Sequence, residues 1–287
     1  MDDFLVGRAV YVYAVGQLVH TLPEGEIIWG VAVLADEVFV LRPKGLDDIE
    51  VYDAVTYRLL RCLTVPDAHG FADMTICRRC RCLYIVDPIA ACIHRLSLHG
   101  ESTRWPVNDK PYSVSVTGTL NVLVTCPSVR QIKEFSWCDG KLLRALSVPD
   151  EVTSPWHAVQ LAAGGQFVVC HGEADDPVHR VCVISPDGRH IVHSNGGRPG
   201  PDTGQYSVPR HLAVDDGGSV FVVDVNNRRV TLLSPTLEHV RQVVSPDNLK
   251  WWPRRLCLDV ETRRLYVVDN QWKEGGLSAG RVVVFSV

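Results

Sequence analysis

A strand-and-turn unit that recurs roughly every 40 to 50 residues constrains this chain more than any other feature. Its most regular element is an apolar run, seen six times as "VFVLR", "LYIVD", "VLVTC", "FVVCH", "VFVVD" and "LYVVD". These runs are rich in Val, Leu, Ile and aromatic residues and are bounded by Gly, Pro, Asp and Asn, as is typical of strands between turns. The period predicts the blades of a β-propeller.

Each unit has the same internal order. A Pro or a large apolar residue opens an inner strand, as in "PRHLAVD", and a short turn leads to the regular run. A polar loop then precedes a third strand such as "RVTLLSP", and a hairpin leads to a fourth such as "HVRQVVSP". The sequence therefore predicts an all-β, six-bladed β-propeller of four-stranded antiparallel blades.

The sixth unit lacks its own fourth strand, and the N-terminal "QLVHTLP" resembles the other outer strands. We expect it to close the ring and so to remove an exposed strand edge. We expect one domain over 1–287, with closing strands in 1–22 and blades at 23–65, 66–106, 107–149, 150–195, 196–246 and 247–287. The run "AVYVY" at 9–13 duplicates a third strand. It either packs outside the closing blade or derives from a longer ancestor.

Composition and charge narrow the function classes. The net charge of -4 gives no overall attraction to phosphates. No apolar run approaches about 20 residues, and the acidic N-terminus is unlike an export signal, so we expect a cytoplasmic protein without a membrane partner. Most of the ten cysteines fall in predicted strands, where we expect reduced thiols in the core. We also expect a monomer.

The fifth unit, "TGQYSVPRHLAVDDGGSVFVVDVNNRRVTLLSP", resembles the NHL repeat, a six-bladed propeller unit. It has the Gly-rich lead-in, the Pro before the inner strand, the Asp-Gly turn and the Asp followed by "NNR". The sixth unit keeps "LYVVDN" and the second keeps "LYIVD", whereas Arg42, Cys126 and His171 stand near the Asp position in the others. The resemblance implies a protein-binding platform, an RNA-binding surface or, in a few branches, a metal-dependent enzyme.

In such a propeller the loops entering the inner strands and leaving the second strands share one rim. Aromatic and Arg side chains are enriched in binding hot spots, and many lie at these positions. The candidate partner-binding residues are Trp29, Tyr112, Trp156, His157, Arg210, His211, Lys250, Trp251, Arg254 and Arg255, with Arg42, His171, Trp252 and Trp272 in nearby loops. They favour a non-enzymatic platform for a protein or peptide partner. The alternative is that the aromatics plug the channel or join neighbouring blades.

Metal-dependent catalysis is a second alternative. His157, His171 and His211 come from neighbouring units, and convergent imidazoles suit zinc. A peptide-amidating lyase that is similar to NHL propellers uses such a zinc. The chain shows no convincing set of supporting catalytic residues, so we predict no catalytic residue and no cofactor. A calcium cage is disfavoured because Asp73 is the only carboxylate beside Gly30, His157 and Arg255 at the inner-strand starts.

RNA recognition is a third alternative, with Arg210, Lys250, Arg254 and Arg255 beside rim aromatics that can stack on bases. The same predicted rim carries the acidic residues Glu24, Glu26, Asp73, Asp150, Glu151, Asp175 and Asp176. Mixed charge favours a protein or peptide instead. In tripartite-motif proteins an NHL propeller selects ubiquitin-ligase substrates, so the resemblance implies substrate selection as one such role, without ligase activity in this chain.

Two short motifs are interpreted as structural. "CRRCRC" at 77–82 has metal-like spacing but no second CxxC pair, and it falls on a predicted hairpin turn. "DVNNRR" at 224–229 repeats an element present in other units. We expect Asp224 to accept backbone hydrogen bonds, Asn226 and Asn227 to tolerate the positive backbone angles that a tight loop can require, and Arg228 to brace the Asp.

Overall fold

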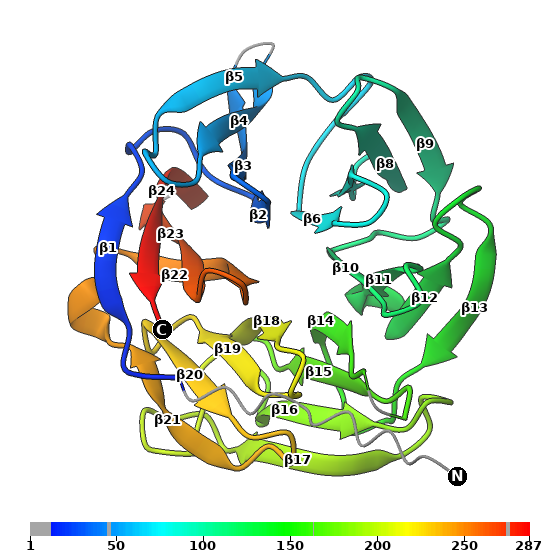
Figure 1. The fold of residues 1–287 in the computed structure, drawn as a ribbon. Coiled ribbons are helices and arrows are strands. Elements are labelled where there is room, and N and C mark those ends of the chain that lie inside the picture. The colour runs from blue at the N-terminus through cyan, green and yellow to red at the C-terminus, as the bar shows by residue number, and fades with distance from the viewer. Residues whose placement is uncertain (1–12, 45–46, 163, 274–275) are drawn as a thin grey trace, which may run out of the picture.

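The computed structural model describes residues 13–44, 47–162, 164–273 and 276–287. Its strands form six four-stranded antiparallel sheets arranged around a central axis, with β2, β6, β10, β14, β18 and β22 innermost (Figure 1). The predicted fold class is confirmed. Each sheet is called a blade below and is numbered from the N-terminal side.

Five blades use four consecutive strands. Blade 1 contains β2 (Gly30–Leu34), β3 (Glu37–Lys44), β4 (Asp47–Asp53) and β5 (Leu59–Leu63). Blade 2 contains β6 (Asp73–Cys77), β7 (Cys82–Asp87), β8 (Cys92–Ser97) and β9 (Ser102–Pro106). Blade 3 contains β10 (Ser113–Val116), β11 (Val122–Cys126), β12 (Gln131–Phe135) and β13 (Leu142–Ser147).

Blade 4 contains β14 (Pro155–Gln160), β15 (Phe167–His171), β16 (His179–Ile184) and β17 (Ile191–Gly197). Blade 5 contains β18 (Pro209–Val214), β19 (Val220–Asp224), β20 (Arg229–Leu233) and β21 (His239–Val244). Blade 6 contains β22 (Trp252–Asp259), β23 (Arg264–Lys273), β24 (Gly276–Ser286) and, outermost, β1 (Gln17–Thr21). Two short 3-10 helices are η1 (Pro127–Val129) and η2 (Pro246–Asn248).

The ring closes as expected, because β1 pairs antiparallel with β24 from Gln17 opposite Ser286 to Thr21 opposite Val283. The open edge of blade 6 is thereby covered. The duplicated run at 9–13 lies outside the described residues except for Tyr13. The buried ring of Tyr13 packs edge-on against Phe221, with 4.9 Å between ring centroids.

The core lies between neighbouring blades. Second strands such as β19 are buried along their whole length, since both faces of a blade meet another blade. On one face Phe221 and Val223 pack with Leu256 and Val267 of blade 6, while the other face meets blade 4. This explains why the second strands are continuous apolar runs rather than alternating patterns.

Three inner strands begin with a β-bulge. The register shifts between Pro155 and His157 in β14, and the same shift recurs at the starts of β18 and β22. The unpaired residues are Trp156, Arg210 and Arg254. A bulge inserts one residue that has no partner across the ladder and changes where its side chain points. All three residues lie on the rim described below, where Arg210 contacts Trp156 and shares a cavity with Arg254.

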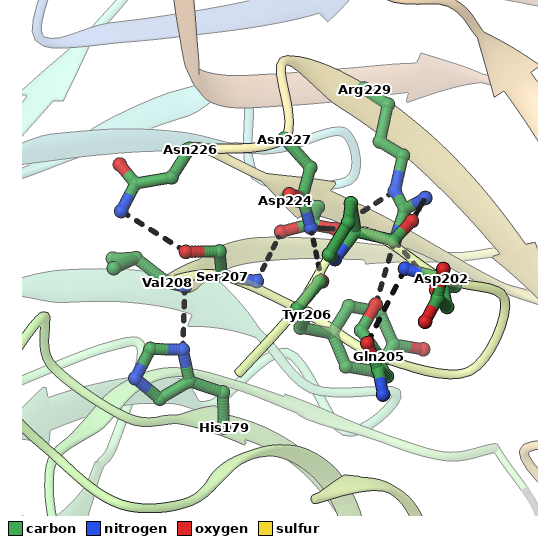
Figure 2. A network of polar contacts seen from close by, with 12 residues as sticks. His179, Asp202, Gln205, Tyr206, Ser207, Val208, Asp224, Asn226, Asn227 and Arg229 are labelled. Carbon is green, nitrogen blue, oxygen red and sulfur yellow. Dashed lines mark hydrogen bonds and ion pairs between the residues drawn. The ribbon is translucent and has the colours of Figure 1, made fainter. Parts of the chain in front are cut away.

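The "DVNNRR" motif joins a strand end to the loop that enters the same blade (Figure 2). Asp224 accepts hydrogen bonds from the Ser207 backbone N–H (2.7 Å), Asn227 Nδ2 (2.7 Å) and Arg229 Nε (2.9 Å). At the equivalent position of β23 in blade 6, Asp269 accepts the backbone N–H groups of Lys250 and Trp251. The motif is therefore a repeated structural clamp, as expected.

Two details of the predicted clamp are wrong. Arg229 braces Asp224, whereas Arg228 donates to the carbonyl oxygens of Trp251 (3.0 Å) and Leu249. The positive backbone angle falls on Arg228, at φ 51°, rather than on either Asn. Asn227 contributes through its side chain, which donates from Nδ2 to Asp224 and to the Gly200 carbonyl oxygen (2.9 Å).

Among the described residues no helix is long and apolar enough to cross a membrane. All ten cysteines are free thiols. In "CRRCRC", Cys77 ends β6, Cys82 begins β7 and Cys80 lies in the turn between them. The Cys82 thiol donates to the Cys80 carbonyl oxygen (3.1 Å), which makes these cysteines part of the hairpin.

Candidate binding site at the channel rim

The inner-strand starts place four polar residues across the channel, and we call them the channel cluster: Asp73, His157, His211 and Arg255. All four are buried, and Asp73 is only 1% exposed. Arg255 Nε donates to Asp73 Oδ1 (3.0 Å), and His211 Nε2 lies 3.4 Å from Asp73 Oδ2. The two imidazoles stack with 3.9 Å between centroids. This cluster links blades 2, 4, 5 and 6 across the axis.

Burial and charge set the protonation of the channel cluster. Burial alone would raise the pKa of Asp73, but the charges of Arg255 and His211 outweigh it and lower that pKa to about 2. Burial lowers the pKa of both His157 and His211. The cluster at neutral pH therefore holds one carboxylate, one guanidinium and two neutral imidazoles.

The predicted zinc triad is not assembled. His171 is fully buried in β15, where its Nε2 lies 3.6 Å from Cys182 Sγ, and Asp73 takes its place beside His157 and His211. These residues fit zinc poorly. His157 Nδ1 already accepts the Leu212 N–H (3.3 Å), which leaves the proton on the other ring nitrogen, and Arg255 sits on the carboxylate. We interpret the cluster as structural.

A second compact group of potential ligands is Asp87, Cys92 and His94, all buried in blade 2. Asp87 occupies the clamp position at the end of its strand. It accepts backbone N–H groups from His69 (2.7 Å), Ile89 (2.9 Å) and Ala90 (2.8 Å), so its oxygens are already engaged. Arg229 and Arg281 lie directly opposite the clamp Asp in their blades, where blade 2 has Cys92, and His94 approaches Asp87 (3.4 Å) from two positions further along β8. This group is also part of the fold.

Above the channel cluster, three predicted rim residues form one contact group. Arg210 Nη1 donates to the Tyr112 hydroxyl oxygen (2.6 Å), and its guanidinium lies 3.9 Å above the Trp156 ring. Tyr112 meets Trp156 edge-on at 4.5 Å. Arg210 also forms an ion pair with Glu173 (3.1 Å). Cation–π contact and a carboxylate thus hold this guanidinium in one place.

Beside this group lies a cavity of about 350 Å³, which we call the rim recess. Its walls include Glu173, Val208, Arg210, Trp252, Arg254 and Trp272. Trp272 is 55% exposed at the end of β23, and the Arg254 guanidinium lies 5.5 Å from its ring. Within the described ranges, Arg254 has no side-chain hydrogen bond and no ion pair. Burial, together with Arg210 and Arg255, lowers the pKa of Arg254 to about 10.

The other predicted rim residues lie apart from the recess. Lys250 forms an ion pair with Glu24 (2.7 Å) and lies 4.6 Å from the ring of Trp251, which is buried. Trp29 packs against the core between blades 1 and 2. Arg42 is buried in an ion pair with Glu50 (3.0 Å). Several candidates are thus structural, and Arg255, at 3% exposure, contacts Asp73 rather than the surface.

Glu173 is the residue of this site that the sequence analysis missed. It lies two positions after β15, in a loop that leaves a second strand and therefore reaches the predicted rim. His179 Nε2 donates to the Glu173 carbonyl oxygen (2.7 Å), and His179 Nδ1 accepts the Val208 N–H (3.0 Å; Figure 2). The loop position was the available signal, although nothing in the sequence pairs Glu173 with Arg210.

The opposite end of the channel holds a larger cavity of about 590 Å³. It is lined mainly by residues from the inner strands and the turns that follow them, such as Val116, Val159 and Val214, and its polar wall includes His157 and His211. The channel cluster therefore separates two hollows. Of these two hollows, as far as the described residues line them, the rim recess is the one that combines a half-buried cation with exposed aromatic surface.

We expect Tyr112 to ionise near pH 8. Burial would raise its pKa, but Arg210, Arg255 and Arg254 lower it to about 8, against 10.0 for an ordinary tyrosine. The resulting contribution to stability is absent below pH 8, grows between pH 8 and 10, and is complete above 10. Denaturation midpoints of the natural protein and Tyr112→Phe should diverge over that interval. Parallel curves would contradict the assignment.

Comparison with known proteins supports the fold. No protein-family model matches the sequence, and no curated protein matches it. A streptogramin B lyase structure is 13% identical, with 92% of this chain and 98% of that chain covered and a TM-score of 0.62. Kuenenia stuttgartiensis hydrazine synthase is 12% identical, with 91% and 97% covered and a TM-score of 0.60.

Virginiamycin B lyase from Staphylococcus aureus is likewise 12% identical, with 92% of this chain and 98% of that chain covered and a TM-score of 0.59. At such low identity these likenesses concern the propeller fold alone. Chemistry belongs to particular residues rather than to a fold, so no activity is transferred from these structures.

Proposed function

We propose that this chain is an NHL-type propeller that acts as a non-enzymatic binding module, taking a peptide or protein partner at the rim recess. The observation that carries the proposal is Arg254, a half-buried guanidinium without a carboxylate partner among the described residues, in a cavity edged by exposed Trp272. Arginine and tryptophan are the residue types that contribute most to protein interfaces.

The surroundings of Arg254 support a peptide over a nucleic acid. Three guanidiniums, those of Arg210, Arg254 and Arg255, face two carboxylates, those of Asp73 and Glu173, which leaves a single positive charge. RNA recognition relies on several uncompensated cations along a strand of phosphates. One residual charge in an apolar recess suits a partner with one anionic group.

Binding should depend on the recess and not on surface charge in general. Using the purified chain as bait, we expect Arg254→Gln and Trp272→Ala each to lower capture of direct partners by about tenfold or more, since each removes a hot-spot type of side chain. The matched controls are Arg189→Gln and Trp137→Ala, which change exposed residues outside the recess. Affinities are then measured by calorimetry with each purified partner.

Equal capture by the natural protein and both recess variants would overturn the proposal. Titration with single-stranded and hairpin RNA at about 150 mM ionic strength forms the second arm. We expect no saturable RNA binding. Tight RNA binding that is lost in Arg254→Gln would assign the recess to RNA instead.

A further inference from the structure

We propose that the rim recess recognises the free C-terminus of a chain, with the terminal carboxylate on Arg254 and an apolar last side chain against Trp252 and Trp272. This inference rests on the proposed function and names the chemical class of its ligand. Four features of the recess carry it.

The first feature is charge. Glu173 is shared with Arg210, and Asp73 with Arg255, so each of those guanidiniums already has a carboxylate. Arg254 is left with a positive charge in partly desolvated surroundings. A single carboxylate balances it, and guanidinium–carboxylate hydrogen bonds are among the stronger polar contacts in proteins. A doubly charged phosphate would exceed the available charge.

The second feature is the apolar wall. Val208, Val225, Trp252, Trp272 and Leu277 contribute to the lining of the recess. Trp272 leaves over half of its side chain exposed, although it belongs to a strand of blade 6. An anionic group attached to an apolar side chain therefore matches this recess. Burial of the apolar side chain against the indoles of Trp252 and Trp272 supplies the main attraction.

The third feature is a free acceptor in the wall of the same recess. Asn226 lines the recess and donates from Nδ2 to Ser207 Oγ (3.2 Å), while its Oδ1 accepts no hydrogen bond in the described part of the chain. Figure 2 shows that oxygen on the side away from Ser207. It is available to the backbone N–H of a terminal residue, whose carboxylate lies two bonds from that nitrogen.

The fourth feature is size. A volume of about 350 Å³ lies near the lower end of the range for ligand pockets, roughly 300 to 1,000 Å³. A terminal residue enters it with one chain segment leaving, whereas an internal Asp or Glu brings two segments across the rim. Each additional segment removes water from backbone groups that have no partner there. A chain end therefore fits better than an internal acidic residue.

The test uses two pools of random peptides with the same sequences, one with free C-termini and one amidated, bound to the immobilised full chain at about 150 mM ionic strength. We expect enrichment only from the free pool, with apolar last residues. Amidation of an enriched peptide should weaken binding by about tenfold to a hundredfold, since a charge-assisted contact is lost.

The Arg254→Gln variant should bind the free peptide more weakly than the natural protein does, by the same factor. It should also bind the free and amidated forms with equal affinity. Such non-additivity identifies Arg254 as the partner of the carboxylate. Arg189→Gln is the matched control and should keep the full preference for the free form. If Arg254→Gln does not fold, the comparison of free and amidated peptides on the natural protein and on Trp272→Ala still decides.

Two failures are distinguishable. In the first, enriched peptides bind equally well when amidated but bind Arg254→Gln or Trp272→Ala more weakly. That result would overturn recognition of the C-terminal carboxylate and leave the proposed function standing. If neither pool is enriched, or if enriched peptides ignore both recess substitutions, both the inference and the proposed function at this rim are wrong.

Discussion

Replacing Asp73 with alanine is expected to lower the free energy of unfolding by about 3 to 5 kcal/mol, because it leaves the buried Arg255 guanidinium without its carboxylate. Asp73 also accepts the backbone N–H groups of Met74 (2.9 Å) and Val114 (3.1 Å), which would lose their partner. This is a large part of the total stability of a typical domain. The denaturation midpoint measures the loss.

The double variant Asp73→Ala with Arg255→Met removes both charges and should lose less than the sum of the single variants. Additive losses in the double variant would refute a coupled pair. Glu24→Gln removes an exposed ion pair with Lys250 and should cost at most about 1 kcal/mol.

The Asp73 contribution to the free energy of unfolding should be present above about pH 4 and fade as the pH falls toward 2, since the pKa of Asp73 in the folded protein lies below the ordinary value. Denaturation midpoints of the natural protein and Asp73→Ala that stay equally far apart between pH 4 and pH 2 would contradict this dependence.

Asp224→Ala is expected to cost about 2 to 4 kcal/mol. Asp224 is fully buried and satisfies the Ser207 N–H, Asn227 and Arg229, and each buried donor left without an acceptor costs about 1 to 3 kcal/mol. The loop entering β18 should loosen first, because Ser207 belongs to it. Amide hydrogen exchange of residues 205–208 would locate the change.

Asn226→Ala is the matched comparison for Asp224→Ala. The Asn226 side chain makes one hydrogen bond, to Ser207 Oγ (3.2 Å), and lies outside the clamp. We therefore expect its removal to lower the free energy of unfolding by at most about 1 kcal/mol. A loss at Asn226 equal to that at Asp224 would mean that the motif as a whole is sensitive, and would contradict the clamp assigned to Asp224.

The blade order could be predicted from sequence because the constraint is periodic. Each second strand is buried on both faces, so its composition records the fold directly in runs such as "VFVVD". The closing strand was predictable for a related reason, since Gln17–Thr21 has the half-exposed pattern of the other outer strands.

The candidate site was predictable in outline only. Alignment of the inner-strand starts singled out Arg210, Arg254 and Trp156, yet it could not separate exposed from buried members of the set. Arg254 and Arg255 are adjacent and chemically identical in the sequence, but the bulge at the start of β22 places one at the rim recess and the other on Asp73. A bulge depends on backbone pairing, which residue type does not reveal.

The pairing of β1 with β24 also fixes the order in which the ring can be completed. During synthesis β1 is the first of the described strands to be made, and its partner β24 is the last of them. Closure is therefore a late, long-range folding step, and such contacts form slowly. Until then both strand edges remain free to pair with other chains. Newly made protein should consequently be most prone to aggregation just before blade 6 is finished.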